Sequence, residues 1–349
     1  MDENLHMAKP VRMADIAQQL HISTVTVSKA LAGKDGVSES LRLKIQQTAE
    51  QMGYQRKIIQ AERHARYTIG IVAERDYIEQ SQSFGWMIYK GLLAVLTKMG
   101  HIGVLETVSV SDMQQHTMPL HIQNHQLDGI VTLGNFPISY RKQLIETGLP
   151  IVAGDAMNAG LPQDTVLSDA YYGIYTMTNY VIQQGHQNIM FVGTPQWSSS
   201  LSDRYYGFCR AMLEAGISVT KKHLLMAQDV QGKWTLSLDL LSELPTAFIC
   251  CCDSVAYQLL RLLKERHLRI PEDVSITGFE DYILSSLCTP PITTYSIHVP
   301  QLAEACIQLL LERIQTPNRP PQHIVISGNI ILRDSVRKLI PTERQAEYR

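Results

Sequence analysis

Near the start of the chain, apolar residues recur at helical spacing in three stretches, which predicts three short helices in succession. The side chains expected to face inward are Met13, Ile16, Ala17 and Leu20 in the first stretch, Val27, Ala30 and Leu31 in the second (24–32), and Leu41, Ile45, Ala49 and Met52 in the third. Ser23 and Ser38 are good N-caps for the second and third helices, and Gly53 ends the third. We therefore expect a small three-helix domain in this region.

The first two predicted helices are joined by a tight turn at His21 and Ile22, which is the arrangement of a helix-turn-helix. The second helix turns short side chains and one cation outward, namely those of Thr24, Val25, Ser28 and Lys29. Such a helix fits the major groove, where hydroxyls contact phosphates or base edges and a lysine reaches phosphate or guanine. The alternative is a helical bundle whose polar face is simply solvated, because amphipathic helix pairs are common.

From Tyr67 onward the pattern changes to short apolar runs that alternate with amphipathic helices. The runs that predict strands are 68–73, 101–107, 128–133, 150–154, 188–193, 246–251 and 274–279, with a final strand pair around 324–331. The main helices are expected at 84–99, 171–184, 204–215, 254–266 and 299–314. This alternation predicts parallel sheets covered on both faces. Because it falls into two similar halves, we expect two lobes with a ligand in the cleft between them.

The composition and charge of the chain narrow the class of protein. A chain of 349 residues is long enough for two or three cores, and it contains no apolar run of 18 residues that would span a membrane. Residues 1–66 hold ten Lys and Arg against seven Asp and Glu, a net of +3, whereas the remainder holds 21 against 26, a net of −5. A basic head on an acidic body fits a nucleic-acid contact confined to the head. The six cysteines lack CxxC spacing and the first residues lack an apolar signal sequence, so we expect a reduced, cytoplasmic protein.

Several runs of this sequence resemble the LacI/GalR (lactose-repressor) family. In the head they are MADIA at 13–17, STVTVSKAL at 23–31, VS at 37–38 and GY at 53–54. In the core they include DGIV at 128–131, PIVAGD at 150–155, GHQNIMFVG at 185–193, SDRYYGF at 202–208, PEDVSITGFED at 271–281, TT at 293–294 and RDS at 333–335. The resemblance covers about residues 12–338. It implies a multidomain fold, in which an all-α helix-turn-helix head precedes an α/β two-lobed core with parallel sheets, like the periplasmic sugar-binding proteins.

The resemblance also implies domain boundaries and DNA contacts. The expected parts are a DNA-binding head at 1–57, a hinge or linker at 58–67, an effector-binding and dimerisation core at 68–340, and a tail at 341–349. Within the core, the N-lobe is expected at about 68–165 and 293–323 and the C-lobe at about 166–292 and 324–340, with crossings near 165, 292 and 323. The candidate DNA contacts are Thr24, Val25, Thr26, Ser28, Lys29, Ser38 and Tyr54.

The segment after the head departs from the family pattern. In the family this hinge becomes helical on DNA and places a leucine in the minor groove as an apolar wedge. In this chain Arg56 stands at the usual proline position and Arg63 at the usual leucine position. Three interpretations stay open: Ile58 or Ile59 supplies the wedge, Arg63 enters a narrow minor groove, or the segment is a flexible charged linker.

Candidate effector contacts follow from the same resemblance. Arg204 matches the family's ligand-gripping arginine, and a guanidinium can hold vicinal hydroxyls or a carboxylate through two parallel hydrogen bonds; the alternative is a surface ion pair. Glu280 stands where the family has a ligand-contacting aspartate, and Cys252 stands where it has an asparagine, so two common contacts are altered. The full set of candidates is Glu74, Arg75, Phe84, Trp86, Asp155, Arg204, Trp234, Cys252 and Glu280.

No catalytic or cofactor motif is present: we find no P-loop, no HExxH, no G-x-S-x-G, and no G-x-G-x-x-G after the first core strand. We therefore expect no cofactor, no bound metal and no membrane contact. The function predicted is that of a homodimeric repressor that binds a pseudo-palindromic site in double-stranded DNA and responds to a small polar effector, a sugar or sugar derivative. The rival interpretation is a cytoplasmic sugar-processing α/β enzyme with an accessory helical head, which would need a paired acid and base.

Overall fold

The computed structural model describes residues 11, 13–31, 36–52, 66–79, 84–156, 160–228, 235–241 and 243–339. The chain divides into two compact units, Met1–Ala65 and Arg66–Arg349. Among the predicted site residues, those that lie outside the described residues are Tyr54, Ile58, Ile59, Arg63 and Trp234, and the predicted tail at 341–349 lies outside them too. Within the described ranges, no helix is long and apolar enough to cross a membrane.

The head contains three helices, α1 (Met13–Gln19), α2 (Thr24–Leu31) and α3 (Glu39–Gln51). Their core consists of the residues predicted to face inward, with Ile16, Ala17, Val27, Ala30, Ile45 and Ala49 fully buried. The backbone amide of Thr26 donates to Ser23 Oγ at 3.1 Å, so Ser23 is the N-cap of α2. His21 has a φ of 50°, and this left-handed residue makes the tight turn between α1 and α2. The head therefore has the predicted helix-turn-helix arrangement.

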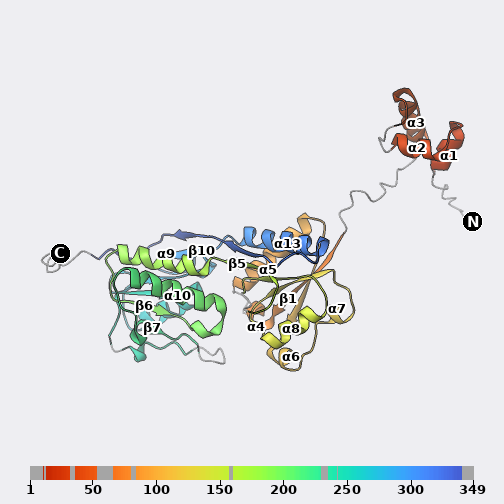
Figure 1. The fold of residues 1–349 in the computed structure, drawn as a ribbon. Coiled ribbons are helices and arrows are strands. Elements are labelled where there is room, and N and C mark those ends of the chain that lie inside the picture. Colours follow the sequence, from red (N-terminus) through yellow and green to blue (C-terminus); the bar gives the residue numbers. More distant parts are fainter. Residues whose placement is uncertain are drawn as a thin grey trace, which may run out of the picture. The chain divides into compact units, whose positions relative to one another are not determined.

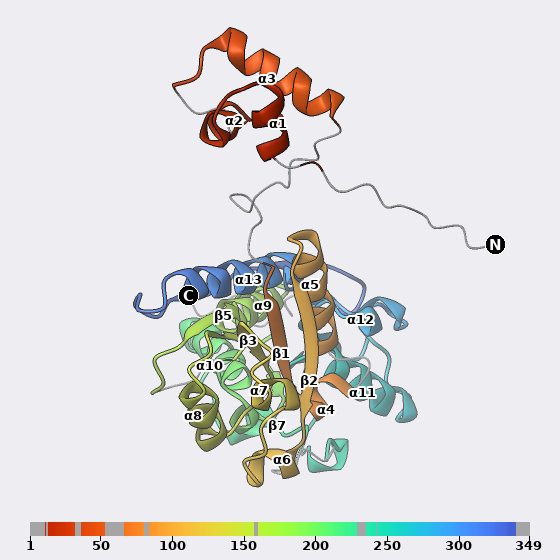
Figure 2. The same cartoon turned by 90° about the vertical axis from the view of Figure 1, so that its right-hand side faces the viewer.

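The first lobe of the core, the N-lobe, is built on a six-stranded parallel sheet in the order β11-β5-β4-β3-β1-β2. Its strands are β1 (Thr68–Glu74), β2 (Ile102–Val108), β3 (Gly129–Leu133), β4 (Ile151–Gly154), β5 (Asp164–Ser168) and β11 (His323–Ile326). One face packs against α5 (Phe84–Lys98) and α13 (Val299–Gln315). The short helices of this lobe are α4 (Arg75–Glu79), α6 (Val110–Gln114), α7 (Leu120–Gln123) and α8 (Ile138–Glu146). Figure 2 shows α5 and α13 together on one side of β1 and β2.

Alternation along the strands explains why both faces of this sheet are covered. In β1, Ile71 belongs to the cluster under α5, whereas the next residue, Val72, packs with Met113 of α6 and Leu144 of α8. Successive side chains of a strand point to opposite faces, so a strand that is apolar throughout needs a helical layer on each side. This confirms the parallel, doubly covered sheet expected from the sequence.

The second lobe, the C-lobe, has a four-stranded parallel sheet in the order β7-β6-β8-β9. Its strands are β6 (Ile189–Val192), β7 (Leu224–Leu225), β8 (Ala247–Cys250) and β9 (Ser275–Thr277). Its helices are α9 (Ala170–Gln183), α10 (Ser199–Glu214), α11 (Asp253–Glu265) and α12 (Ile283–Leu287), with short 3-10 turns η1 (Pro195–Trp197), η2 (Lys221–His223) and η3 (Leu238–Leu240). The long helices α9 and α10 lie side by side over this sheet (Figure 1).

The chain passes between the lobes three times. It leaves the N-lobe sheet after β5 to enter α9, returns from β10 (Thr294–Ser296) to α13, and passes from β11 to β12 (Asn329–Ile331). The expected strand pair at 324–331 is wrong as a pairing: β11 joins the N-lobe sheet beside β5, whereas β12 pairs antiparallel with β10. Two residues, Ser327 and Gly328, separate these strands, so each strand serves a different lobe.

Candidate functional site

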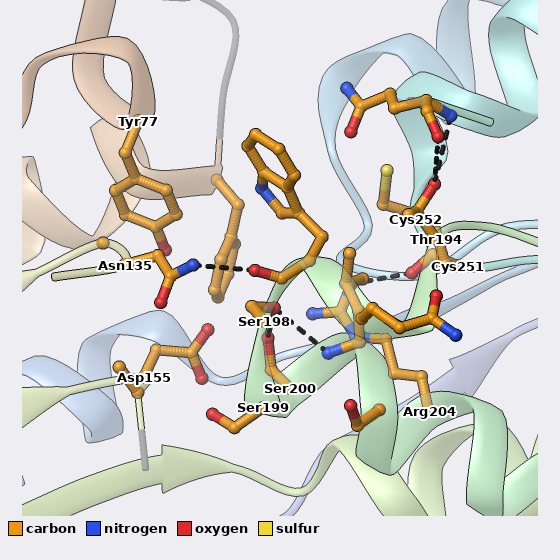
Figure 3. A pocket seen from close by; sticks show the side chains of 18 of the residues that line it. Tyr77, Asn135, Asp155, Thr194, Ser198, Ser199, Ser200, Arg204, Cys251 and Cys252 are labelled. Atoms are coloured by element: carbon orange, nitrogen blue, oxygen red, sulfur yellow. Dashed lines mark hydrogen bonds between the residues drawn. The ribbon is translucent and has the colours of Figure 1, made fainter. Parts of the chain in front are cut away.

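Both sheets reverse their strand order at positions that face the cleft. In the N-lobe the chain places β2 on one side of β1 and β3 on the other; in the C-lobe it places β7 and β8 on either side of β6. Open α/β sheets bind ligands outside the carboxyl ends of the strands at such a switch point. A cavity of about 520 Å³ lies there, lined by loops that follow β1, β3 and β4 on one side and β6, β8 and β9 on the other. Figure 3 shows side chains of both lobes converging on this cavity.

The two lobes contribute different chemistry to this cavity, which we call the cleft. The N-lobe lines it with Glu74, Tyr77, Phe84, Gly134, Asn135, Arg141, Asp155 and Ala156. The C-lobe lines it with Thr194, Gln196, Trp197, Ser198, Ser199, Ser200, Leu201, Ser202, Arg204, Ala227, Gln228, Cys251, Cys252, Ser254, Val255 and Glu280. The N-lobe wall therefore offers two aromatic rings, two carboxyl groups and a guanidinium, whereas the C-lobe wall is rich in hydroxyl groups and also holds Trp197, Arg204 and Glu280.

Arg204 is held rigidly in the C-lobe wall. Its Nη1 donates to the carbonyl oxygen of Cys251 at 2.7 Å and to Glu280 Oε1 at 3.0 Å. Its guanidinium carbon lies 4.2 Å from the ring centre of Phe279. The residue is 2% exposed, and its Nε has no hydrogen-bond partner among the described residues. A buried donor without a partner is costly, so this nitrogen is suited to a ligand acceptor.

Glu280 has a strained backbone and a perturbed carboxyl group. Its φ is 102°, and its amide donates to the carbonyl oxygen of Tyr295 at 2.7 Å, which fixes the turn after β9. Burial raises the pKa of the Glu280 carboxyl to about 7, although Arg204 acts in the opposite direction. The carboxyl group therefore exchanges its proton near neutral pH.

Two further N-lobe groups, Asp155 and Tyr77, face the same space. Asp155 has a φ of 55° and accepts hydrogen bonds from the amide of Ser168, at 2.9 Å, and from its hydroxyl. Burial raises the pKa of Asp155, and the bonds from Ser168 partly oppose that rise. Burial, Asp155 and Glu280 raise the pKa of Tyr77 well above its usual value, so its hydroxyl stays protonated. Asp155 thus supplies an acceptor and Tyr77 a donor.

The serine-rich run begins α10 rather than preceding it. We expected a helix from 204, but α10 starts at Ser199 because Ser198 caps it, accepting from the amide of Leu201 at 3.2 Å. Arg204 therefore lies in the second turn. Close by, Asn135 Nδ2 donates to the carbonyl oxygen of Trp197 at 2.7 Å, which joins the N-lobe to the C-lobe across the cleft.

The structure brings most of the predicted effector contacts together. Those that line the cleft are Glu74, Phe84, Asp155, Arg204, Cys252 and Glu280. Arg75 and Trp86 lie outside its lining: the Arg75 guanidinium is 3.7 Å from Asp112, and Trp86 is exposed on α5, with its ring centre 5.1 Å from that of Tyr89. Lining residues that we did not predict include Tyr77, Asn135, Arg141, Trp197 and the serines of α10. The serine run was visible in the sequence, but Tyr77 and Asn135 carried no motif.

The outward face of α2 is the second candidate site. Thr24, Val25, Ser28 and Lys29 are exposed, and Val25 is 62% exposed although it is apolar. Thr26 differs, because it is half-buried and its hydroxyl lies 2.8 Å from Ser23 Oγ. Ser38, also exposed, comes just before α3. An exposed valine between small polar groups and a lysine has the chemistry of a helix that contacts base edges.

The head and the core of the chain each match the model of a known protein family. The model of the bacterial regulatory proteins of the lacI family matches residues 12–57, and a periplasmic binding protein-like domain matches residues 178–336. The HTH-type transcriptional repressor CytR of Escherichia coli is 26% identical over 94% of this chain and 96% of its own length. The HTH-type transcriptional repressor PurR of Glaesserella parasuis is 30% identical over 62% of this chain and 69% of its own length.

Solved structures agree on the fold. The transcriptional regulator CelR in complex with cellobiose superposes with a TM-score of 0.69 at 22% identity, over 93% of this chain and 99% of its own. The helix-turn-helix head and the periplasmic-binding-protein-like core expected from the sequence are therefore confirmed. The relatives are transcriptional repressors and not enzymes, which decides against the sugar-processing enzyme.

Proposed function

Because this chain belongs to the lacI family of bacterial regulatory proteins, we propose that it is a transcriptional repressor whose affinity for DNA is set by a small sugar-like effector in the cleft. The proposed DNA site is a pseudo-palindrome in double-stranded DNA, contacted by the two heads of a homodimer. A two-fold symmetric dimer presents two identical heads, so the two half-sites repeat with inverted orientation.

One observation carries the effector part of this proposal. Arg204 is buried in the wall of the cleft, with Nη1 bonded to Cys251 and Glu280 and with Nε unpartnered within the part of the chain that the structure describes. Vicinal hydroxyls can accept hydrogen bonds from this nitrogen, and Asp155 can accept hydrogen bonds from ligand hydroxyls. Phe84 and Tyr77 offer aromatic surface to the apolar side of a sugar ring.

The link between effector and DNA is proposed to be the relative position of the lobes. An effector that touches Glu74 and Asp155 on one lobe and Arg204 on the other stabilises the lobe arrangement in which these contacts can be made together. The effector shifts DNA affinity only as far as it prefers that arrangement over the other. In a dimer, the changed arrangement alters the spacing of the two heads and hence the fit to both half-sites.

The DNA part can be tested by selection from random double-stranded DNA with the full-length protein at low salt. We expect enrichment of an inverted repeat whose half-sites lie about one helical turn apart. Enriched sequences without inverted symmetry would overturn the dimeric reading, and no enrichment would overturn DNA recognition.

The effector part can be tested on the same protein by calorimetry and thermal shift with neutral mono- and disaccharides, their phosphates and nucleobases. A ligand at 100 times its dissociation constant should stabilise the protein by about 2.7 kcal/mol. We expect binding that Arg204→Ala abolishes and that changes the affinity for the selected DNA. A ligand whose binding does not depend on Arg204 would place the site elsewhere.

A further inference from the structure

A second cavity of about 310 Å³ adjoins the cleft in the N-lobe. Glu74 and Asn135 line both cavities. The second cavity is otherwise lined by residues after β2 and β3, among them Met113, Gln114, His116 and Pro137. It therefore lies outside the carboxyl ends of β1, β2 and β3, beside the same switch point as the cleft. Its volume is within the range of small-molecule pockets, which begins at roughly 300 Å³.

The wall between the two cavities is polar and positioned by the backbone. The amide of Asn135 donates to Glu74 Oε2 at 2.7 Å, which holds the carboxyl group against the loop after β3. Glu74 Oε1 is the oxygen that this amide does not contact, and burial raises the pKa of the carboxyl group. The same Asn135 reaches the other lobe through its bond to Trp197. A group that passes from one cavity to the other therefore meets an acceptor of Glu74 and the amide of Asn135.

The second cavity has the mixed surface that suits a neutral, hydroxylated ring. Met113 is buried and, with Pro137, offers apolar contact. His116 is oriented by the hydrogen bond between its Nδ1 and Gln143 Oε1, at 3.0 Å, and Gln114 adds an amide. The residues of its described lining include no Lys or Arg, and Glu74 would repel an anion. A phosphate or carboxylate group is therefore disfavoured there.

We propose that the effector is a two-ring glycoside, with one ring gripped by Arg204 in the cleft and a second neutral, hydroxylated ring in the second cavity. This inference rests on the proposed function, and it specifies the size and charge of the ligand at that site. The linkage between the rings lies beside Glu74 and Asn135, which hydrogen-bond to the hydroxyls on either side of it.

Calorimetry on the full-length protein tests this, with α- and β-linked disaccharides of glucose and galactose and with the two monosaccharides. We expect at least one disaccharide to bind about 10-fold or more tightly than its own monosaccharides. Ser139→Trp, at an exposed position of α8 that lines the second cavity, should reduce that disaccharide's affinity about 10-fold. The same variant should change monosaccharide affinity by less than about 3-fold. Lys142→Trp, exposed on the same helix outside both linings, is the control and should leave both affinities unchanged.

Three results would overturn the inference. They are a disaccharide that binds no better than its monosaccharides, a Ser139→Trp variant that binds the disaccharide like wild type, and a variant that loses both ligands equally. If a monosaccharide then binds through Arg204 and changes DNA affinity, the proposed function still holds, but the second ring is ruled out. If no saccharide binds at all, both the two-ring ligand and the sugar-like effector are ruled out. The DNA selection experiment still tests the DNA-binding part of the proposed function separately.

Discussion

Arg204 Nη1 and Glu280 Oε1 lie 3.0 Å apart in the wall of the cleft, with side chains only 3% and 12% exposed. The arginine comes from the second turn of α10 and the glutamate from the left-handed turn after β9. When Glu280 is ionised, their contact neutralises the guanidinium before any ligand arrives. A neutral effector can therefore use Arg204 as a donor without bringing a countercharge into the cleft.

The protonation of Glu280 should make the stability of the core depend on pH. The ordinary pKa of this carboxyl group is 4.5, and in the folded protein its pKa is about 7. Between these values the folded chain holds more protons than the unfolded chain, so the free energy of unfolding contributed by Glu280 falls as pH rises from about 4.5 to about 7. Over that range the loss should reach up to about 3 kcal/mol.

Urea denaturation of wild type and Glu280→Gln between pH 5 and pH 8, followed by intrinsic fluorescence, measures this contribution. The difference between the two free energies of unfolding should shift steadily in favour of the variant up to about pH 7 and then level off. Parallel curves across the whole range would show that Glu280 is ionised with an ordinary pKa.

Replacing Arg204 by lysine should weaken effector binding while leaving the head intact. A lysine keeps the charge near Glu280 but cannot hold Cys251 and Glu280 and also present a second donor in the place of the arginine Nε. The loss of a hydrogen bond from a charged donor corresponds to about 10- to 100-fold in affinity. Calorimetry gives the effector affinity, and DNA affinity without effector should stay within about 3-fold. Equal effector binding by the lysine variant would contradict a ligand contact at Nε of Arg204.

Lys29→Ala should weaken DNA binding and reduce its dependence on salt. Lys29 is exposed near the end of α2, where an amino group can reach a phosphate. Each lost phosphate contact lowers the slope of log K against log salt by about 0.9. Fluorescence anisotropy at several salt concentrations measures the slope. Lys44→Ala, exposed on α3, is the comparison; an equal loss there would mean that the contact is not specific to α2.

Ile45→Ala should unfold the head without disturbing the core. Ile45 is fully buried in the small cluster of α1, α2 and α3, and its truncation should cost about 2–5 kcal/mol. Because the head is a compact unit by itself, we expect loss of DNA binding with unchanged effector affinity. Exposed Gln46→Ala serves as the control. Joint loss of both activities would show that the two units fold cooperatively.

Asp164→Asn should destabilise the N-lobe. The Asp164 side chain is fully buried and accepts hydrogen bonds from Arg313, Arg319 and the amide of Gln322. Removing one charge of a buried ion pair costs about 3–5 kcal/mol. Urea denaturation should therefore show an earlier core transition. Glu312→Gln, at an exposed position of the same helix α13, provides the control.

The sequence predicted strands and helices correctly where a local pattern of apolar residues coincides with burial in the fold. The apolar runs of β1, β3 and β6 are buried on both faces, so they stood out without any knowledge of their neighbours. In the same way, the N-cap Ser23 and the apolar spacing of α2 were sufficient to predict the helix-turn-helix of the head. Trp86 could also have been placed correctly: Phe84 and Ile88 are buried one turn apart, and a residue midway between them faces away from the core.

Other features depend on contacts that are distant in sequence. Asp164–Ser168 contains too many polar residues to be recognised as a strand, and β5 forms because β4 and β11 pair with its two edges. Tyr77 lies in the short helix α4 and Asn135 in the loop after β3, and both positions follow from the packing of the sheet, so nothing local marked them as cleft residues.

The three crossings between the lobes also affect the order in which the protein is completed on the ribosome. The head is a contiguous stretch whose last described helix, α3, ends at Gln51, whereas the N-lobe sheet is complete only with β11 and the C-lobe needs β12. Contiguous domains fold as units while synthesis continues. The part that would contact DNA is thus able to fold early. The N-lobe sheet is complete with β11, and the C-lobe is completed shortly afterwards, because Ser335 and Leu339 also bond to its strands and helices.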